Sequence, residues 1–175
     1  GRYTSDINLV NQTYAYFVRS PHARASISKV DTSKASNCPG VVKILTGEDL
    51  EKDKIGGMIA GWKIVSHDGT DMKCPPHPPL ANNIVNFVGD HVAVVIAETL
   101  DQSKDAAEKV RVDYKVLKAV VNTSDALNSK AIHDGIDKNL SFDFLLGDKG
   151  KTDEAFSKAD KVVKLDLVNN RLIPN

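Results

Sequence analysis

The fold is decided by Ile84-Val-Asn-Phe-Val-Gly-Asp90 and the run that follows it, His91-Val-Ala-Val-Val-Ile-Ala-Glu98. The first run carries the β-branched and aromatic residues typical of strands. The second is nearly all apolar, which predicts a central strand buried on both faces. Glycine at the first turn position accepts the positive φ of a two-residue hairpin. The stretch therefore predicts two paired strands joined at Gly89-Asp90, with Gly89 and Asp90 as structural residues.

A helix is predicted directly after this second strand. Thr99 is the expected N-cap, and Gln102 three residues later completes a T-x-x-Q capping box. Small residues recur at helical spacing and predict a buried stripe that lies close to a sheet: Ser103, Ala106, Ala107 and Val110. Strand residues return at Val112-Asp-Tyr114. Strand, turn, strand, helix and strand in this order predict an α/β (α+β) fold, a mixed sheet with packed helices.

Further strands and one helix are predicted on either side of this block. Alternating or β-branched runs predict strands at Tyr14–Arg19, 24–30, 41–45 and 162–168. A helix with an acidic first turn is expected over 152–160. The irregular, polar stretch 132–144 predicts a seam between two units, and the helix and strand after it look like the beginning of something larger.

The region from Glu51 to Asn83 is a long segment without a helical or strand pattern. Loops of this length are uncommon inside compact domains and are usually functional. Its apolar side chains need a surface to cover, in this domain or on a partner. We interpret it as a possible partner-facing loop, represented by Trp62, Met72 and His77.

The composition excludes several classes of protein. The 175 residues contain 23 basic and 23 acidic side chains, so nothing in the charge favours nucleic acid or an anionic membrane. No apolar run approaches the roughly 20 residues that span a bilayer. The two cysteines, Cys38 and Cys74, form no disulfide framework and favour a cytoplasmic, reducing location. The chain begins at Gly1 without a methionine, which predicts that something upstream was removed.

Residue groups that could carry chemistry are few. Cys74-x-x-His77, with His67 and Asp71 nearby, supplies only one ligand pair of the two that structural zinc usually uses. Ser20-Pro-His22 lacks the G-x-S-x-G context of a nucleophile and favours a simple turn. Neither glycine-rich nucleotide motif occurs. We therefore predict no catalytic, cofactor-binding or metal-binding residue in this chain.

Motifs in order along nearly the whole chain resemble the N-terminal part of the large subunit of the xanthine dehydrogenase and aldehyde oxidase family, the α/β hammerhead domain of the molybdenum hydroxylases. The segments that resemble the hammerhead domain are Gly1-Arg-Tyr-Thr-Ser-Asp-Ile7, Phe17-Val-Arg-Ser-Pro-His-Ala23, Ile27, Asp31-Thr-Ser33, Pro39-Gly-Val-Val42, Leu45-Thr-Gly-Glu-Asp-Leu50, Phe87-Val-Gly-Asp90, Val92-Ala-Val-Val-Ile-Ala-Glu98, Val112-Asp-Tyr114 and Val120. The sequence departs from the family pattern at His91, where the family usually has proline. Gly147-Asp148, Ala155-Phe156, Ala159-Asp160 and 167–175 resemble the entry into the molybdopterin domain. The Trp62 loop and the ending Asn169-Asn-Arg-Leu-Ile-Pro174 look most like the aerobic carbon monoxide dehydrogenase large-subunit group.

The resemblance implies an oxidoreductase. Such enzymes hydroxylate a carbon centre of carbon monoxide, an aldehyde or a heterocycle at a molybdenum–pterin centre, and electrons leave through iron–sulfur clusters to FAD in partner subunits. The segments that bind the pterin lie beyond the matched region. Residues 1–138 are then expected to form the hammerhead domain and 139–175 the truncated start of the molybdopterin-binding domain, inactive alone. Two alternatives remain: a stand-alone binding or scaffold module that holds a partner with residues 51–83, and a small zinc protein using Cys74 and His77.

Overall fold

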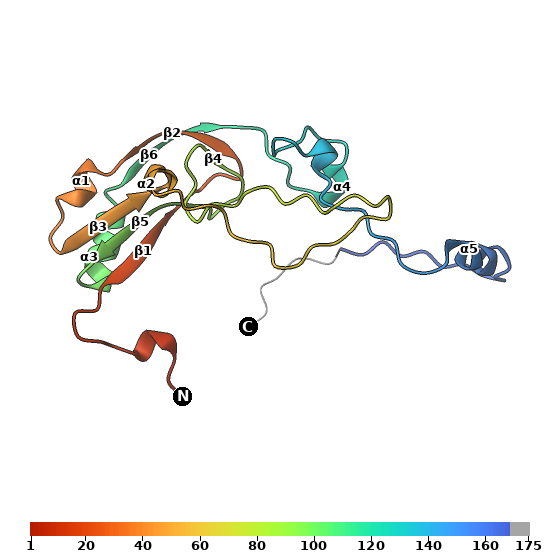
Figure 1. The fold of residues 1–175 in the computed structure, drawn as a ribbon, viewed down its shortest axis with the longest axis horizontal. Coiled ribbons are helices and arrows are strands. Elements are labelled where there is room, and N and C mark those ends of the chain that lie inside the picture. The colour runs from red at the N-terminus through yellow and green to blue at the C-terminus, as the bar shows by residue number, and fades with distance from the viewer. Residues whose placement is uncertain (169–175) are drawn as a thin grey trace. The chain divides into compact units, whose positions relative to one another are not determined.

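The computed structural model describes residues 1–168, so the motif at 169–175 lies outside the described residues. The chain divides into two compact units, Gly1–Asp143 and Phe144–Asn175. The strands of the first unit are β1 (Tyr14–Arg19), β2 (Ala25–Asp31), β3 (Val41–Thr46), β4 (Ile84–Val85), β5 (His91–Ala97) and β6 (Arg111–Val116). Its α-helices are α1 (Ser33–Ser36), α2 (Gly47–Lys52), α3 (Leu100–Ala107) and α4 (Thr123–Ala126), with 3-10 turns at Thr4–Asp6 and Asp137–Asn139. The predicted α/β class is confirmed (Figure 1).

The strands form two separate three-stranded sheets. One has the order β1-β5-β3 and the other the order β4-β2-β6, and every pair in both is antiparallel. The prediction of one mixed sheet is therefore wrong, although the α/β class is correct. The chain changes sheet at each successive strand, so that no two consecutive strands pair with each other.

The predicted hairpin at Gly89-Asp90 is also wrong. The preceding strand β4 pairs with β2, through Val85 opposite Ala25, whereas β5 pairs with β1 and β3. Gly89 does have the expected positive φ, +93°. Its backbone N–H donates to the carbonyl of Ser20 at 2.8 Å. The turn thus joins one sheet to the other, and the interactions that hold it come from the end of β1.

Two apolar clusters hold the first unit together. Ala25, Ala81, Val85 and Val92 form one cluster, which contains residues of both sheets. The second joins Val95 of β5 to Ala106 and Ala107 of α3. The central position of β5 is confirmed, because five of its seven residues are buried. Val92 of β5 thus belongs to the cluster beside the second sheet, and Val95 belongs to the cluster under α3.

Helix α3 has the cap that the sequence predicts. The Thr99 side chain accepts from the backbone N–H of Gln102 at 3.2 Å, and the Gln102 side chain accepts from the backbone N–H of Thr99 at 3.1 Å. Ser103, Ala106 and Ala107 are its buried residues. Because these side chains are small, the helix lies close against β1 and β5.

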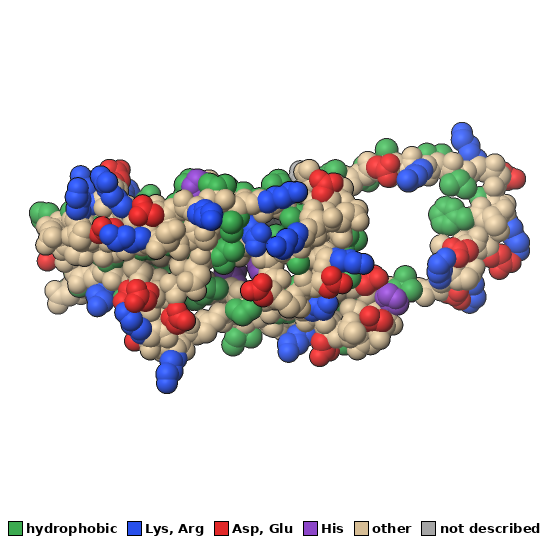
Figure 2. All heavy atoms as spheres, turned by 90° about the horizontal axis from the view of Figure 1, so that it is seen from above, with side chains coloured by type: hydrophobic (Ala, Val, Ile, Leu, Met, Phe, Trp, Pro, Cys, Tyr) green, Lys and Arg blue, Asp and Glu red, His purple; other side chains and the backbone are tan. Residues whose placement is uncertain are grey.

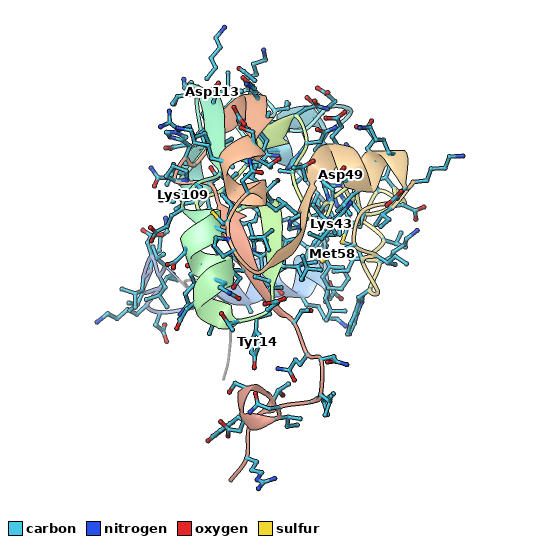
Figure 3. The ribbon with its side chains drawn as sticks, turned by 90° about the vertical axis from the view of Figure 1, so that its left-hand side faces the viewer. Tyr14, Lys43, Asp49, Met58, Lys109 and Asp113 are labelled. Atoms are coloured by element: carbon cyan, nitrogen blue, oxygen red, sulfur yellow. The ribbon has the colours of Figure 1, made fainter. Side chains whose placement is uncertain are left out.

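A second capping box starts α2. The backbone N–H and the hydroxyl of Thr46 both donate to Asp49 Oδ2 at 2.8 Å. These hydrogen bonds, with smaller contributions from the nearby charges of Lys52 and Lys43, lower the pKa of the Asp49 carboxyl below its ordinary value of 3.8. Figure 3 shows Asp49 at the start of α2 beside Lys43 of β3.

The second unit contains one helix among its described residues, α5 (Lys149–Ser157). It begins three residues earlier than predicted, because Asp148 caps it by accepting from the backbone N–H of Lys151 at 3.0 Å. The predicted strand at 162–168 is absent, and every described residue after Asp143 is exposed. A strand needs a partner for its backbone hydrogen bonds, and the described part of this unit supplies none.

Replacing Gly89 by valine should lower the free energy of unfolding by about 1–3 kcal/mol, the usual cost of holding a non-glycine residue in a sparsely populated backbone region. A Cβ at Gly89 would meet no atom within 4 Å, so the cost comes from φ rather than from a clash. Gly61→Val is the matched control, because Gly61 has open space and lacks a positive φ. Urea denaturation gives both values, and equal effects of the two variants would contradict the explanation.

Asp49→Ala should destabilise the chain by about 1 kcal/mol at pH 7, since it removes the acidic partner of the α2 cap. The folded-state pKa is lowered, so this stability is present above pH 3.8 and is lost as the pH falls below it. The difference between the variant and the unmodified chain should therefore shrink in urea denaturation at pH 3. Asp53→Ala, at the other end of α2, is the control; a difference that is equal at both pH values would argue against a role for the carboxylate.

Candidate partner-binding site

The loop between α2 and β4 is held mainly by hydrogen bonds along its own length. It has no helix or strand, apart from an isolated bridge between Val65 and Asp71. The backbone N–H of Met58 donates to the carbonyl of His77 at 2.8 Å, and Met72 donates in the same way to Ile64 at 2.9 Å. The loop therefore runs outward and returns beside itself, as the yellow trace in Figure 1 shows.

A second segment of the first unit fastens the outer part of this loop. His67 N donates to the Asp143 carbonyl and Lys73 N to the Ser141 carbonyl, both at 2.9 Å. The Ser141 hydroxyl donates back to the Lys73 carbonyl, also at 2.9 Å. Ser66 is buried, and its hydroxyl accepts from Asp143 N. These contacts fix the backbone of the loop while leaving most of its side chains free.

The apolar side chains of the loop point mostly to solvent. Ile59 is 94% exposed, Trp62 81% and Met58 63%. Of the three residues predicted to face a partner, Trp62 and His77 are exposed and Met72 is half-buried. His77 also makes an edge-on contact with Phe87, with ring centroids 5.7 Å apart. Exposed apolar groups grouped in one segment are typical of an interaction surface.

A groove of about 750 Å³ adjoins the returning end of the loop. Its walls include Pro75, Pro76, Phe87 and Ile132, and its polar lining includes Arg24, Asn86, Asp90 and His133. The Arg24 guanidinium donates from its Nη2 atom to the Ile132 carbonyl at 3.0 Å. Arg24 Nε and Asn86 Oδ1 are buried without a hydrogen-bond partner among the described residues. No sequence motif marks Arg24 or Asn86, because burial of a single polar atom leaves no pattern in a sequence.

The Ser20-Pro-His22 segment, weighed above as a nucleophile and base, and the histidines His91 and His67 each make local contacts within the first unit. The Ser20 hydroxyl accepts from His22 N at 3.1 Å and donates to the His22 carbonyl at 3.2 Å, the pattern of a local turn. His91 stacks on Phe17, and burial together with the neighbouring charge of Arg19 lowers the pKa of its imidazole. His67 pairs with Asp143 at 3.4 Å.

The potential metal ligands of the chain are scattered over the described residues. Within residues 1–168 no three His, Cys, Asp or Glu side chains are placed together for metal binding. Cys74 is exposed and Cys38 is half-buried against the cluster under α3, and both are free thiols. Basic and acidic side chains are interspersed over the surface seen in Figure 2. Among the described residues, no helix has the length and apolar character needed to cross a bilayer.

Comparisons with known proteins match this architecture to one family. The sequence model described as aldehyde oxidase and xanthine dehydrogenase, a/b hammerhead domain, matches residues 1–118. The nicotine 6-hydroxylase large subunit of Paenarthrobacter nicotinovorans is 34% identical over 170 residues, 93% of this chain and 19% of that protein. The carbon monoxide dehydrogenase large chain of Afipia carboxidovorans is 32% identical over 191 residues, 100% of this chain and 22% of that protein.

A solved structure agrees with these matches. The Cu,Mo-CO dehydrogenase in its carbon monoxide reduced state has a TM-score of 0.71 and 30% identity, over 92% of this chain and 21% of that one. The class defined by this fold and these matches is the α/β hammerhead domain. The chain belongs to the aldehyde oxidase and xanthine dehydrogenase family of molybdenum hydroxylases, and it spans about a fifth of the length of these relatives.

Trp62 is the only tryptophan, so its fluorescence reports on the loop. In the 175-residue chain we expect red-shifted emission that acrylamide quenches readily, because 81% of the residue is exposed. If the loop faces a partner, Trp62 should show blue-shifted, protected emission in the product of the full coding sequence. To isolate its signal, the emission is measured on a variant of that product in which every other tryptophan is replaced by phenylalanine. Identical quenching in the two proteins would show that the loop around Trp62 remains uncovered.

Proposed function

We propose that this chain is the N-terminal structural part of the large subunit of a molybdopterin-dependent oxidoreductase, and that it is inactive alone. The observation that carries the proposal is the family match over residues 1–118, extended by relatives that align with almost the entire chain. The substrate class would be carbon monoxide, an aldehyde or a nitrogen heterocycle. The names of two relatives, a carbon monoxide dehydrogenase and a nicotine 6-hydroxylase, support carbon monoxide and a heterocycle within that range.

The described residues suit a supporting role better than a catalytic one. A molybdenum–pterin centre needs a cavity rich in hydrogen-bonding groups, and a base needs to stand beside the reacting carbon. Among the hydrogen bonds of residues 1–168 are those that cap α2 and α3 and those that fix the 51–83 loop. We find no fit for the centre in these residues, and we assign them no catalytic step.

The domain division follows from the same proposal. Residues 1–138 would form the hammerhead domain, and 139–175 would open the molybdopterin-binding domain. The remainder of the large subunit, an iron–sulfur subunit and a flavin subunit would complete the enzyme. The relatives are named as a large subunit and a large chain, which supports an assembly of several polypeptides. The free thiols of Cys38 and Cys74 support a cytoplasmic location.

Metal analysis tests this proposal directly. The product of the full coding sequence, purified with its co-expressed neighbouring subunits, should contain about one molybdenum per large subunit and should reduce an electron-acceptor dye with a substrate of one of the three classes. The 175-residue chain, prepared in parallel, should contain no stoichiometric molybdenum and show no turnover. Tight pterin or molybdenum binding by the 175-residue chain would overturn the supporting role.

A stand-alone binding module is the second candidate, because the exposed side chains of Met58, Ile59 and Trp62 would also suit capture of a partner. The coding sequence discriminates between the two. Continuation for several hundred codons beyond Asn175 supports the large-subunit proposal. A stop codon directly after Asn175 would favour the binding module.

A further inference from the structure

A nearly uncharged, apolar run occupies the outgoing half of the long loop. Residues 55–65 read Ile-Gly-Gly-Met-Ile-Ala-Gly-Trp-Lys-Ile-Val, and Lys63 is the one charged residue among them. Five large apolar residues of this apolar run are exposed: Ile55, Met58, Ile59, Trp62 and Val65. Single apolar residues on a surface are ordinary, but five within eleven consecutive residues are a concentration typical of a surface that another one covers.

The backbone that carries these side chains is already fixed. Ile55 N donates to the Leu50 carbonyl at 2.9 Å, which ties the start of the apolar run to α2. Further along, the run lies so close to the returning half of the loop that a Cβ on Gly57 would come within 2.8 Å of His77 N. A surface on a fixed backbone loses little further conformational entropy when it is covered. The apolar run is therefore preformed for contact.

The polypeptide leaves the first unit beside this loop. Asp143 is the last residue of that unit, and its carbonyl accepts from His67 N at 2.9 Å. Trp62 is five residues from His67, so even a fully extended chain would place the two within about 17 Å of each other. Polypeptide that follows is thereby tethered near the apolar run, and a tether raises the effective concentration of a binding surface to the order of millimolar. A separate subunit has no such advantage, because it must overcome the full entropic cost of association.

The composition of the apolar run also favours a permanent neighbour. Charged residues make up 26% of the chain but only one of these eleven residues. Depletion of charge marks the core of an interface, and permanent interfaces are more apolar than those between proteins that separate. The surface therefore suits a neighbour that stays in place once the protein has folded.

We propose that the apolar run packs against polypeptide of the same large subunit beyond residue 175, and so joins the hammerhead domain to the part of the subunit that follows. This inference rests on the proposed function. Since the chain spans 19% and 22% of two relatives, about four-fifths of such a subunit lies outside it. The iron–sulfur and flavin subunits then dock elsewhere on the enzyme.

Photocross-linking in the full-length enzyme tests which polypeptide covers the run. A benzoylphenylalanine at Ile59, which is 94% exposed, should cross-link to one contiguous segment of the large subunit beyond residue 175. The product should keep the mass of one large subunit on a denaturing gel. The same probe at Val121, which is 80% exposed and lies outside the loop, is the control and should not reach that segment.

Four outcomes of this experiment would each overturn the proposal. A product with the mass of two large subunits would identify a second copy as the neighbour. A cross-link to an iron–sulfur or flavin subunit would identify a separate partner. Cross-links confined to residues 1–175, or no cross-link at all, would show that no later segment covers the run.

The Ile59→Ser variant supplies an independent measurement. In the 175-residue chain it changes an exposed side chain, so the melting temperature should stay the same. In the full-length enzyme it removes a covered apolar side chain, so the melting temperature should fall. Val121→Ser is the matched control and should shift the full-length enzyme less. An equal shift in both proteins, or a shift of the full-length enzyme no larger than that of the control, would contradict the proposal.

Molybdenum content, measured on the same preparations, separates the two proposals. Molybdenum without a cross-link to the later segment would leave the function standing and reject this neighbour of the apolar run. A cross-link without molybdenum would reject the function and keep the neighbour.

Discussion

The structure depends on a pair of backbone hydrogen bonds between Ser20 and the Gly89-Asp90 turn. Ser20 N donates to the Asp90 carbonyl, and Gly89 N donates to the Ser20 carbonyl, both at 2.8 Å. Ser20 and Asp90 are almost completely buried. At Ser20 the chain leaves β1 for the second sheet. At Gly89-Asp90 it leaves β4 of the second sheet and enters β5 of the first. Because unpaired buried backbone groups are costly, these reciprocal bonds fix where both crossings occur.

The crossings explain why the two sheets behave as one domain. Odd-numbered strands form one sheet and even-numbered strands the other, so each connection passes between sheets. The cluster of Ala25, Val85 and Val92 packs residues of both sheets together near the crossing point. All strand pairs are consequently distant in sequence, which favours slower folding than a succession of hairpins would allow. Neither three-stranded sheet has its strands contiguous in the chain, so neither can be removed intact.

Local signals in the sequence predicted elements well and their pairing badly. The T-x-x-Q box at Thr99, the small stripe of α3 and the apolar run of β5 are each decided within a few residues, and each is found. Pairing depends on residues far away. Gly89 was correctly assigned a positive φ, but the same conformation serves a hairpin or a crossing between sheets, and the pairing of β4 with β2 instead of β5 distinguishes them. The prediction of a strand at 162–168 was wrong for a related reason. A strand-like sequence pattern does not supply the neighbouring strand that its backbone must pair with.

The buried polar atoms of the groove residues were the hardest features to predict, because burial of a polar atom leaves no pattern in a sequence. Trp62 and His77 could be named, since an apolar or aromatic residue in a long irregular loop is conspicuous. Arg24 and Asn86 could not, since each is ordinary until the fold buries one of its atoms. The two sheets pair through their central strands β5 and β2, whereas the long loop between α2 and β4 has no partner strand among the described residues and exposes Ile59 and Trp62. A unit whose two sheets pair in this way can fold around its own core, and the side chains of the long loop then remain available for contact with another surface.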